Sequence, residues 1–258
     1  MFKELIQYRD LLFMLTLRDI KIRYKQAVMG FFWAIFMPVM AVLAGVLVKK
    51  AMSIASGKPM DIMGVISISV KVLPWTFFIS SIRFAVQSLV GNANLVTKIY
   101  FPKEVLPLSS TIACFIDFVI AALALSVMLV FVNVGVSIYL LWLPVILIFL
   151  VLFTAGLGLL LSSANLFFRD IKYVVEVILM FGIFFTPVFY NADAFGKWKA
   201  ILLLNPIGSL LESINSVVVL HQMPEINWFV YAGVISIATF FIGMLVFQKT
   251  EPLFAENI

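Results

Sequence analysis

Long apolar runs alternate with short polar segments along this chain. A helix needs about 20 predominantly apolar residues to cross a lipid bilayer. Runs that approach or exceed this length are Val28–Val48, Ile62–Val90, Val105–Val132, Tyr139–Leu166, Tyr173–Tyr190 and Trp228–Phe247. The pattern therefore predicts an all-α, polytopic membrane protein with six transmembrane helices and with both termini on the same side.

The composition agrees that the solvent is lipid. Hydrophobic residues make up 64% of the 258 residues and charged residues only 12%, whereas soluble domains have about 45–50% apolar and about 25% charged residues. The net charge of +5 is interpreted as orientation against anionic lipid and not as nucleic-acid binding. The one cysteine, Cys114, excludes an intramolecular disulfide and a thiolate metal cluster.

Lysine and arginine residues are distributed unequally between the two sides, which predicts the orientation. If the N-terminus is cytoplasmic, the cytoplasmic segments carry Lys3, Arg9, Arg18, Lys21, Arg23, Lys25, Lys98, Lys103, Arg169, Lys172 and Lys249. The outer segments carry Lys49, Lys50, Lys58, Lys197 and Lys199, and the remaining two, Lys71 and Arg83, fall within a run. We therefore expect both termini in the cytoplasm.

The sequence predicts a single domain, residues 1–258. Three polar segments within it differ from the apolar runs. Residues 1–27 surround an apolar block that is too short to span and lacks a signal cleavage site, which indicates an interfacial helix. Residues 91–104 contain no histidine or cysteine, so this loop favours contact with a soluble partner over catalysis. Residues 191–227 mix a short apolar piece with polar ones, which indicates re-entrant or periplasmic helices.

A few ionisable residues fall within or near the apolar runs. Arg83 and Asp117 are costly at mid-bilayer, and they either face a translocation path or form interhelical pairs or snorkel to an interface. Glu176 is interpreted as a snorkelling or partner-contacting acid and Lys71 as a marker of the outer interface. His221 is interpreted as a solvated surface residue, because a metal site needs several preorganised ligands. No metal site is predicted.

Several stretches carry a more specific likeness. They are RDIKIRYKQAVMGFFWAIFMPV, LPWTFFISSIRFAVQSLVGNANLVTKIYFPKEVLPLSS, NLFFRDIKYVVEVILMFGIFFTPVFY, LLLNPIGSLLE and KTEPLFAENI. In this order they resemble ABC-2 type permeases that export polysaccharides, the O-antigen permeases above all, with capsule and teichoic-acid exporters as near relatives. Residues 51–73, with an unusual Lys71, depart from the family pattern.

The resemblance implies a homodimer in the inner membrane, joined by two separate cytoplasmic ATPase subunits. ATP and Mg²⁺ would be bound by those subunits, and the sequence contains no GxxxxGK[ST] phosphate loop and no cofactor site of its own. The chain would therefore be a transport subunit and not an enzyme. Its substrate would be a lipid-linked polysaccharide, moved from the cytoplasmic leaflet to the periplasm.

The resemblance also implies roles for three sets of residues. Coupling to the ATPase would involve Asn92, Asn94, Lys98, Tyr100, Phe101, Lys103 and Glu104. The interface helix would present Arg18, Asp19, Lys21, Arg23, Tyr24 and Lys25, which could equally anchor the first span to anionic lipid. Candidate lining of the sugar path comprises Trp33, Phe36, Trp75, Phe77, Arg83, Phe184, Phe185 and Tyr190, although aromatic residues also form belts at membrane interfaces.

Two other functions that polytopic membrane proteins perform fit this sequence less well. A gradient-driven transporter favours inverted repeats and ion sites at mid-depth, and neither is evident in the sequence. An enzyme that acts on a polyprenyl lipid needs acids or histidines clustered at one membrane face, and the acids of this chain are scattered. A neighbouring ATPase gene would distinguish the exporter from both.

Overall fold

A computed structural model of the chain describes residues 7–24, 32–56 and 62–254, and every element in these ranges is helical. The α-helices are α2 (Arg9–Tyr24), α3 (Phe32–Ser56), α4 (Ile62–Gly91), α5 (Ala93–Lys98), α6 (Val105–Phe131), α7 (Leu143–Phe167), α8 (Ile171–Phe185), α9 (Lys199–Leu203), α10 (Pro206–Val218) and α11 (Ile226–Thr250). Short 3-10 helices are η1 (Ile138–Trp142), η2 (Ala192–Trp198) and η3 (Glu251–Leu253).

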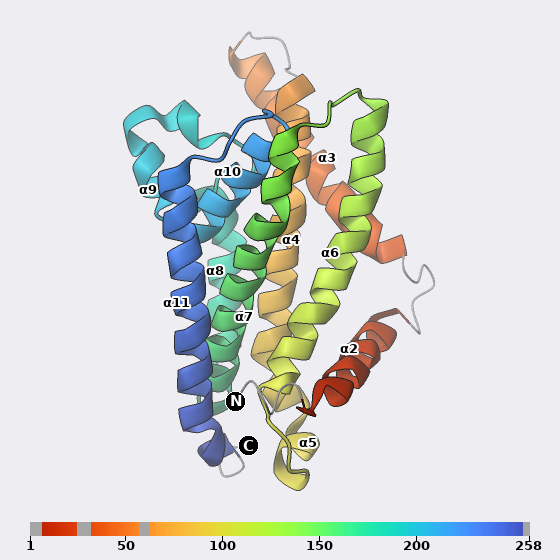
Figure 1. The fold of residues 1–258 in the computed structure, drawn as a ribbon, viewed down its shortest axis with the longest axis vertical. Coiled ribbons are helices and arrows are strands. Elements are labelled where there is room, and N and C mark those ends of the chain that lie inside the picture. The colour runs from red at the N-terminus through yellow and green to blue at the C-terminus, as the bar shows by residue number, and fades with distance from the viewer. Residues whose placement is uncertain (1–6, 25–31, 57–61, 255–258) are drawn as a thin grey trace.

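The long helices form an elongated bundle around α4 (Figure 1), which packs against α3, α6, α7, α8 and α10. Helix α5 lies at the lower end in this view, and α9 and α10 lie at the upper end. We call these ends the α5 end and the α10 end. Helix α2 and the last described element, η3, both lie toward the α5 end. The first and last described helical segments are therefore on the same side, as the span count predicts.

Among the described residues, four helical segments are long and apolar enough to cross a membrane, namely Met63–Gly91, Val105–Phe131, Ile138–Phe167 and Ile226–Leu253. They correspond to the second, third, fourth and sixth predicted spans. The first predicted span begins outside the described residues, and α3 continues past its predicted end to Ser56. The fifth is shorter than predicted, because α8 ends at Phe185, and a 15-residue helix is only about 22 Å long. The count of six spans stays a prediction.

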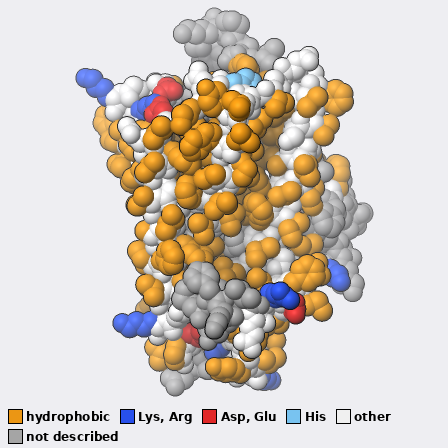
Figure 2. Space-filling model, in the orientation of Figure 1, with side chains coloured by type: hydrophobic (Ala, Val, Ile, Leu, Met, Phe, Trp, Pro, Cys, Tyr) orange, Lys and Arg blue, Asp and Glu red, His pale blue; other side chains and the backbone are white. Residues whose placement is uncertain are grey.

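The outer surface matches a protein that sits in lipid. Hydrophobic side chains cover the middle of the face shown in Figure 2, and charged side chains gather toward the two ends. Large apolar side chains such as Phe131 and Met180 are 81% and 66% exposed, which would be costly over so large an area in water. The class of multi-pass membrane protein follows from this surface together with the four long apolar helices.

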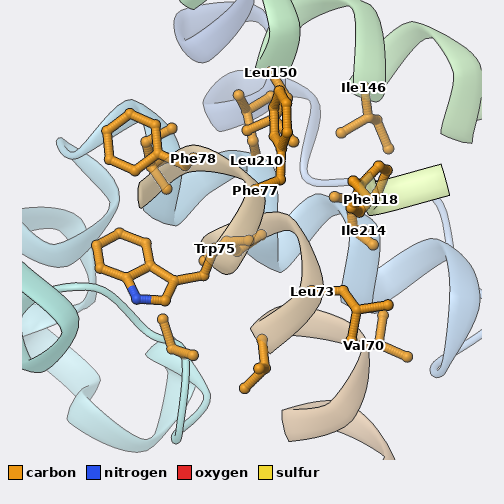
Figure 3. Packing of buried hydrophobic residues seen from close by; sticks show 14 of the residues in the cluster. Val70, Leu73, Trp75, Phe77, Phe78, Phe118, Ile146, Leu150, Leu210 and Ile214 are labelled. Atoms are coloured by element: carbon orange, nitrogen blue, oxygen red, sulfur yellow. The ribbon is translucent and has the colours of Figure 1, made fainter. Parts of the chain in front are cut away.

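The interior contains two clusters of buried apolar residues. The larger one surrounds α4 and includes Val70, Leu73, Trp75, Phe77, Phe78, Phe118, Ile146, Leu150, Leu210 and Ile214 (Figure 3). The smaller one lies at the α5 end, where Val96, Phe101 and Leu106 pack with Met244 and Phe254. Pro74 lies inside α4, where neighbouring helices in a membrane protein tolerate it. The two clusters fix the helices whose ends carry the polar segments.

Helices α7 and α11 approach each other at glycine. A Cβ atom on Gly156 would lie 2.6 Å from backbone atoms of Thr239 and Phe240, and one on Gly243 would meet the backbone of Gly156. Neither backbone can move away without separating the helices. Close approach of this kind is the usual role of small residues between membrane helices.

We expect Gly156→Ala to lower the free energy of unfolding by about 1–3 kcal/mol, the range for overpacking a close contact. Unfolding in mixed micelles with a denaturing detergent would measure it. Gly182→Ala is the matched control, because a Cβ there would lie 3.5 Å from the Trp75 ring, an ordinary contact distance. Equal stability of the two variants would contradict the packing interpretation.

Candidate functional site

The segment 91–104 forms the tip of the α5 end (Figure 1). Asn94, Lys98 and Tyr100 are exposed, and the Tyr100 side chain is 97% exposed. Ile99 next to it is 53% exposed. An exposed tyrosine, an exposed isoleucine and a lysine together present a small amphipathic surface beyond the bundle, with the aromatic character that protein interfaces favour.

The other predicted coupling residues attach this tip to the bundle. Asn92 donates a hydrogen bond from Nδ2 to the Ser88 carbonyl oxygen at 2.7 Å, and Phe101 is buried in the smaller apolar cluster. The backbone N–H of Lys103 donates to Glu251 Oε1 at 3.1 Å, and its ammonium lies 4.0 Å from the same oxygen. Glu104 is 2% exposed. The predicted set thus divides into an exposed part and an anchoring part.

Helix α2 lies against α6 through polar contacts. Arg23 Nη1 is 2.8 Å from Asp117 Oδ2, and its guanidinium lies 4.0 Å from the centre of the Phe84 ring. Asp19 Oδ2 accepts hydrogen bonds from the hydroxyls of Ser109 and Ser110. Of the alternatives that the sequence left open for Asp117, the structure shows the interhelical pair, with α2 as its partner element.

These contacts leave only part of the predicted interface set facing outward. Arg18 pairs with Asp19 at 2.9 Å and stays one-third exposed, and Lys21 is exposed. The side chain of Tyr24 and the whole of Lys25 lie outside the described residues. The helix is thus held to the bundle by Asp19 and Arg23 and by Leu15, which is buried in the smaller apolar cluster, while Arg18 and Lys21 are available for lipid or protein contacts.

Arg83 of α4 and Glu176 of α8 form an ion pair, with 2.8 Å between Arg83 Nη2 and Glu176 Oε2. The interhelical pairing that the sequence analysis offered for Arg83 is confirmed. The two side chains are nevertheless 47% and 43% exposed. An ion pair on an apolar surface is costly against lipid, so this part of the surface needs either water or protein beside it.

Four of the predicted lining residues fall into two groups, one buried and one exposed. Trp75 and Phe77 are 4% and 3% exposed and pack inside the larger apolar cluster (Figure 3). Phe184 and Phe185 are 67% and 71% exposed near the end of α8. Tyr190 is half-buried and donates from its hydroxyl to the Phe184 carbonyl oxygen at 2.9 Å. Phe36 is also half-buried, and the side chain of Trp33 lies outside the described residues.

The Lys71 side chain does not lie where the sequence predicts it. Its side chain is 0% exposed, so the expectation that it marks the outer interface is wrong. The ammonium group donates to the Tyr190 carbonyl oxygen at 2.5 Å and to Asn191 Oδ1 at 2.9 Å, and lies 3.3 Å from Glu212 Oε1. A buried lysine requires such partners, because an unpaired charge is too costly in a low dielectric.

The same network joins further polar groups at the α10 end. The Ser67 hydroxyl lies 2.7 Å from Asn215 Oδ1 and 3.1 Å from Asn191 Oδ1, and Glu212 Oε1 also accepts from the backbone N–H of Ala192 at 2.8 Å. Ser67 and Lys71 are four residues apart and therefore share one helix face. That spacing, and an acid within the apolar helix α10, are the signals that could have indicated the network.

A second group of charges lies nearby in residues 192–225. Lys199 pairs with Asp193 at 2.7 Å and also with Glu225. Burial lowers the pKa of Lys199, but the hydrogen bonds and charges of Asp193 and Glu225 outweigh it, so its pKa is raised above the ordinary value. Within the part of the chain that the structure describes, no group of three or more histidine, cysteine or acidic side chains could hold a metal ion.

The long apolar helices and the apolar outer surface define a multi-pass helical membrane protein. The chain belongs to the ABC-2 type transporter family, whose model matches residues 10–219.

Relatives with assigned functions match over nearly their whole length. An O-antigen export system permease protein RfbA from Myxococcus xanthus is 27% identical over 99% of this chain and 98% of its own length. Two proteins of the same name from Klebsiella pneumoniae are 30% and 28% identical, each over 96% of this chain and 94% of its own length. The chain is therefore similar to these permeases from end to end.

Proposed function

We propose that this chain is the membrane permease subunit of an ABC exporter that moves a lipid-linked polysaccharide of the O-antigen type across the inner membrane. The observation that carries the proposal is the end-to-end similarity to three O-antigen export permeases. A capsular or teichoic-acid polymer is the alternative cargo within the same family. The sequence has no phosphate loop, so the proposal assigns ATP hydrolysis to separate subunits.

The proposed assembly is a homodimer with two cytoplasmic ATPase subunits, six spans per permease and both termini in the cytoplasm. The excess of lysine and arginine in segments at the α5 end supports this orientation. The exposed side chains of Lys98 and Tyr100 support α5 as the element that enters the ATPase surface. The buried Phe101 supports rigid transmission, because it ties this tip to α6 and α11 through the smaller apolar cluster.

The proposed path for the glycan lies between two copies of the chain. The half-exposed pair of Arg83 and Glu176 supports it, because two copies could exclude lipid from this surface. The exposed rings of Phe184 and Phe185, which lie on α8 with Glu176, could stack against sugar C–H faces. Trp75 and Phe77 could reach the path only if the subunit core opened, so we place the lining at α8, Arg83 and Tyr190.

The proposed mechanism transmits motion and performs no chemistry within this chain. ATP binding closes the partner subunits, α5 moves with them, and the spans separate or rotate to advance the glycan. The movement of α5 would pass to the spans through the corner where α4, α5 and α6 meet. This corner is rigid, because Leu89, Val96 and Val105 are each less than 3% exposed. Such packed corners deform little and therefore transmit displacement.

Co-expression with an ABC ATPase subunit from the same organism tests the proposal. We expect the two proteins to co-purify from detergent and the complex to expose the glycan on the outer face only when the ATPase can hydrolyse ATP. An ATPase with its Walker-B acid removed is the control, since it still assembles. Export driven by an ion gradient without the ATPase would establish a secondary transporter instead. Modification of a polyprenyl lipid by the chain alone would establish an enzyme.

A further inference from the structure

An apolar crevice lies between α4 and α6 in the half of the bundle toward the α10 end. The two helices meet where the rings of Phe77 and Phe118 pack, with 5.6 Å between ring centres, and α6 leans away from α4 beyond this point (Figure 1). Residues of α7 and α10 complete the walls, and the crevice holds about 220 Å³. Its lining includes Val70, Leu73, Phe118, Leu125, Leu147 and Ile214.

The chemistry of the walls disfavours water and sugars. Ser126 is the one polar side chain among the described lining residues, and its hydroxyl already donates to the Ala122 carbonyl oxygen at 2.8 Å. A buried water molecule needs two to four polar partners, whereas an apolar cavity of about 150 Å³ stays dry and binds a hydrocarbon such as benzene. The crevice is larger than that, so it is suited to a hydrocarbon ligand.

The crevice follows α6 and opens onto the surface that faces lipid. Its lining residues on this helix extend from Phe118 to Leu129, which corresponds to about 16 Å at the rise of an α-helix. Leu123 belongs to the lining and is nevertheless 63% exposed, so the crevice is continuous with the apolar outer surface of α6. A long apolar space that is open to the bilayer admits an extended chain from a lipid.

The inner walls lie deeper than bulk lipid reaches. Leu73 and Ile214 line the crevice although they are only 5% and 4% exposed. If the crevice were empty, these walls would have no atoms to contact on one side and would lose the corresponding dispersion energy. A chain that enters restores contacts on α4, α6, α7 and α10 together. The crevice should therefore retain one chain longer than the rest of the surface does.

We infer that this crevice is a binding site for one acyl chain of a phospholipid from the membrane leaflet at the α10 end. A second copy of this chain is not the occupant, because the face proposed for it carries the Arg83–Glu176 pair and the exposed rings of α8. Neither Arg83 nor any described residue of α8 lines the crevice. The inference goes beyond the transport of a glycan, since it assigns a lipid ligand to the permease itself.

The acyl chain would pack against the junction that the Lys71 network holds. Val70 precedes Lys71 on α4, and Ile214 lies between Glu212 and Asn215 on α10. Lys71 and Glu212 form the ion pair that joins these two helices. The lipid would therefore add apolar contacts between α4 and α10 beside their polar ones.

Photo-crosslinking tests the site on the full chain in nanodiscs of phosphatidylethanolamine that carries a diazirine midway along one acyl chain. We expect mass spectrometry to find label on the buried Leu73 and Ile214 as well as on the exposed Val127. Ala122→Phe should reduce the label on Leu73 and Ile214 about fivefold, because the added ring occupies the space at the density of a packed interior. Val127→Phe is the matched control, because Val127 is 57% exposed on the same helix and does not line the crevice.

Ser126→Phe is a second filling variant, at an exposed lining residue, and it keeps the test decisive if Ala122→Phe does not fold. Label on Val127 alone, or undiminished label on Leu73 and Ile214 in a folded filling variant, would overturn the site and leave bulk lipid only. Preferential labelling of these two residues by a diazirine-bearing polyprenyl phosphate would also overturn it, in favour of a carrier lipid. ATP-driven export is measured separately, so failure of the lipid site leaves the proposed function intact.

Discussion

Replacing Lys71 with methionine should lower the free energy of unfolding by about 3–5 kcal/mol, because it leaves Glu212 without its buried cation. The Lys71 side chain is fully buried, and its ammonium contacts the 190–191 turn and Glu212. These contacts join α4 to the segment that carries α9 and α10. The variant should therefore also loosen the α10 end, which unfolding in mixed micelles and limited proteolysis within residues 192–225 would both detect.

A double variant separates the charge from the packing. Lys71→Met combined with Glu212→Leu removes both charges, and paired removal of a buried ion pair is often close to neutral, so most of the lost stability should return. Lys199→Met is the matched control, because Lys199 pairs with the exposed Asp193 and Glu225 and exposed pairs contribute about 0–1 kcal/mol. Lys71→Met with unchanged stability would show that the network does not hold the α10 end.

Tyr100→Ala should weaken association with the partner ATPase about thirtyfold, the factor for an aromatic anchor that contributes about 2 kcal/mol. Tyr100 is 97% exposed at the α5 tip, so its removal should leave the permease fold intact. Lys98→Glu should weaken association in the same direction if the ATPase surface is acidic. Titration of the ATPase onto permease nanodiscs measures both, with Tyr139→Ala as the control, because Tyr139 lies in η1, before α7.

Variants of Lys103 test whether this residue contacts the ATPase or anchors the α5 tip to the bundle. Reversing its charge should also reduce coupling, but through repulsion of Glu251, which the backbone N–H and ammonium of Lys103 approach. Adding Glu251→Lys to Lys103→Glu should then restore export, because the pair is re-formed with opposite signs. No such rescue is expected for Lys98→Glu. Failure of Glu251→Lys to rescue Lys103→Glu would remove Glu251 as the anchor of Lys103, and unchanged assembly in Tyr100→Ala would remove the α5 tip as the coupling element.

Most helices could be predicted because each follows from local hydropathy. The predicted runs that begin at Ile62, Val105 and Trp228 fall on α4, α6 and α11, since a single segment in lipid satisfies all of its own backbone groups only as a helix. The polar tip at 91–104 is predictable for the same reason, because a polar loop cannot remain in the bilayer. The shorter α8 was not predicted, because Thr186 and Pro187 end the helix inside a run that stays apolar to Tyr190.

The burial of side chains was much harder to predict. Trp75 and Phe77 face the core while Phe184 and Phe185 face outward, although all four lie in apolar helices. In a soluble protein the polar face of a helix indicates its exposed side. In lipid both sides are apolar, so hydropathy no longer separates the core from the surface.

The amino-acid sequence alone determined the membrane class, the position of the polar tip at residues 91–104 and the family resemblance, because these depend on composition and on order along the chain. Only the tertiary structure decided the partners of the charges. Lys71 meets Glu212 across 141 positions and Arg23 meets Asp117 across 94. Such pairs form because the packed helices bring isolated charges together where an unpaired charge would be too costly. The local sequence around either residue does not predict its partner.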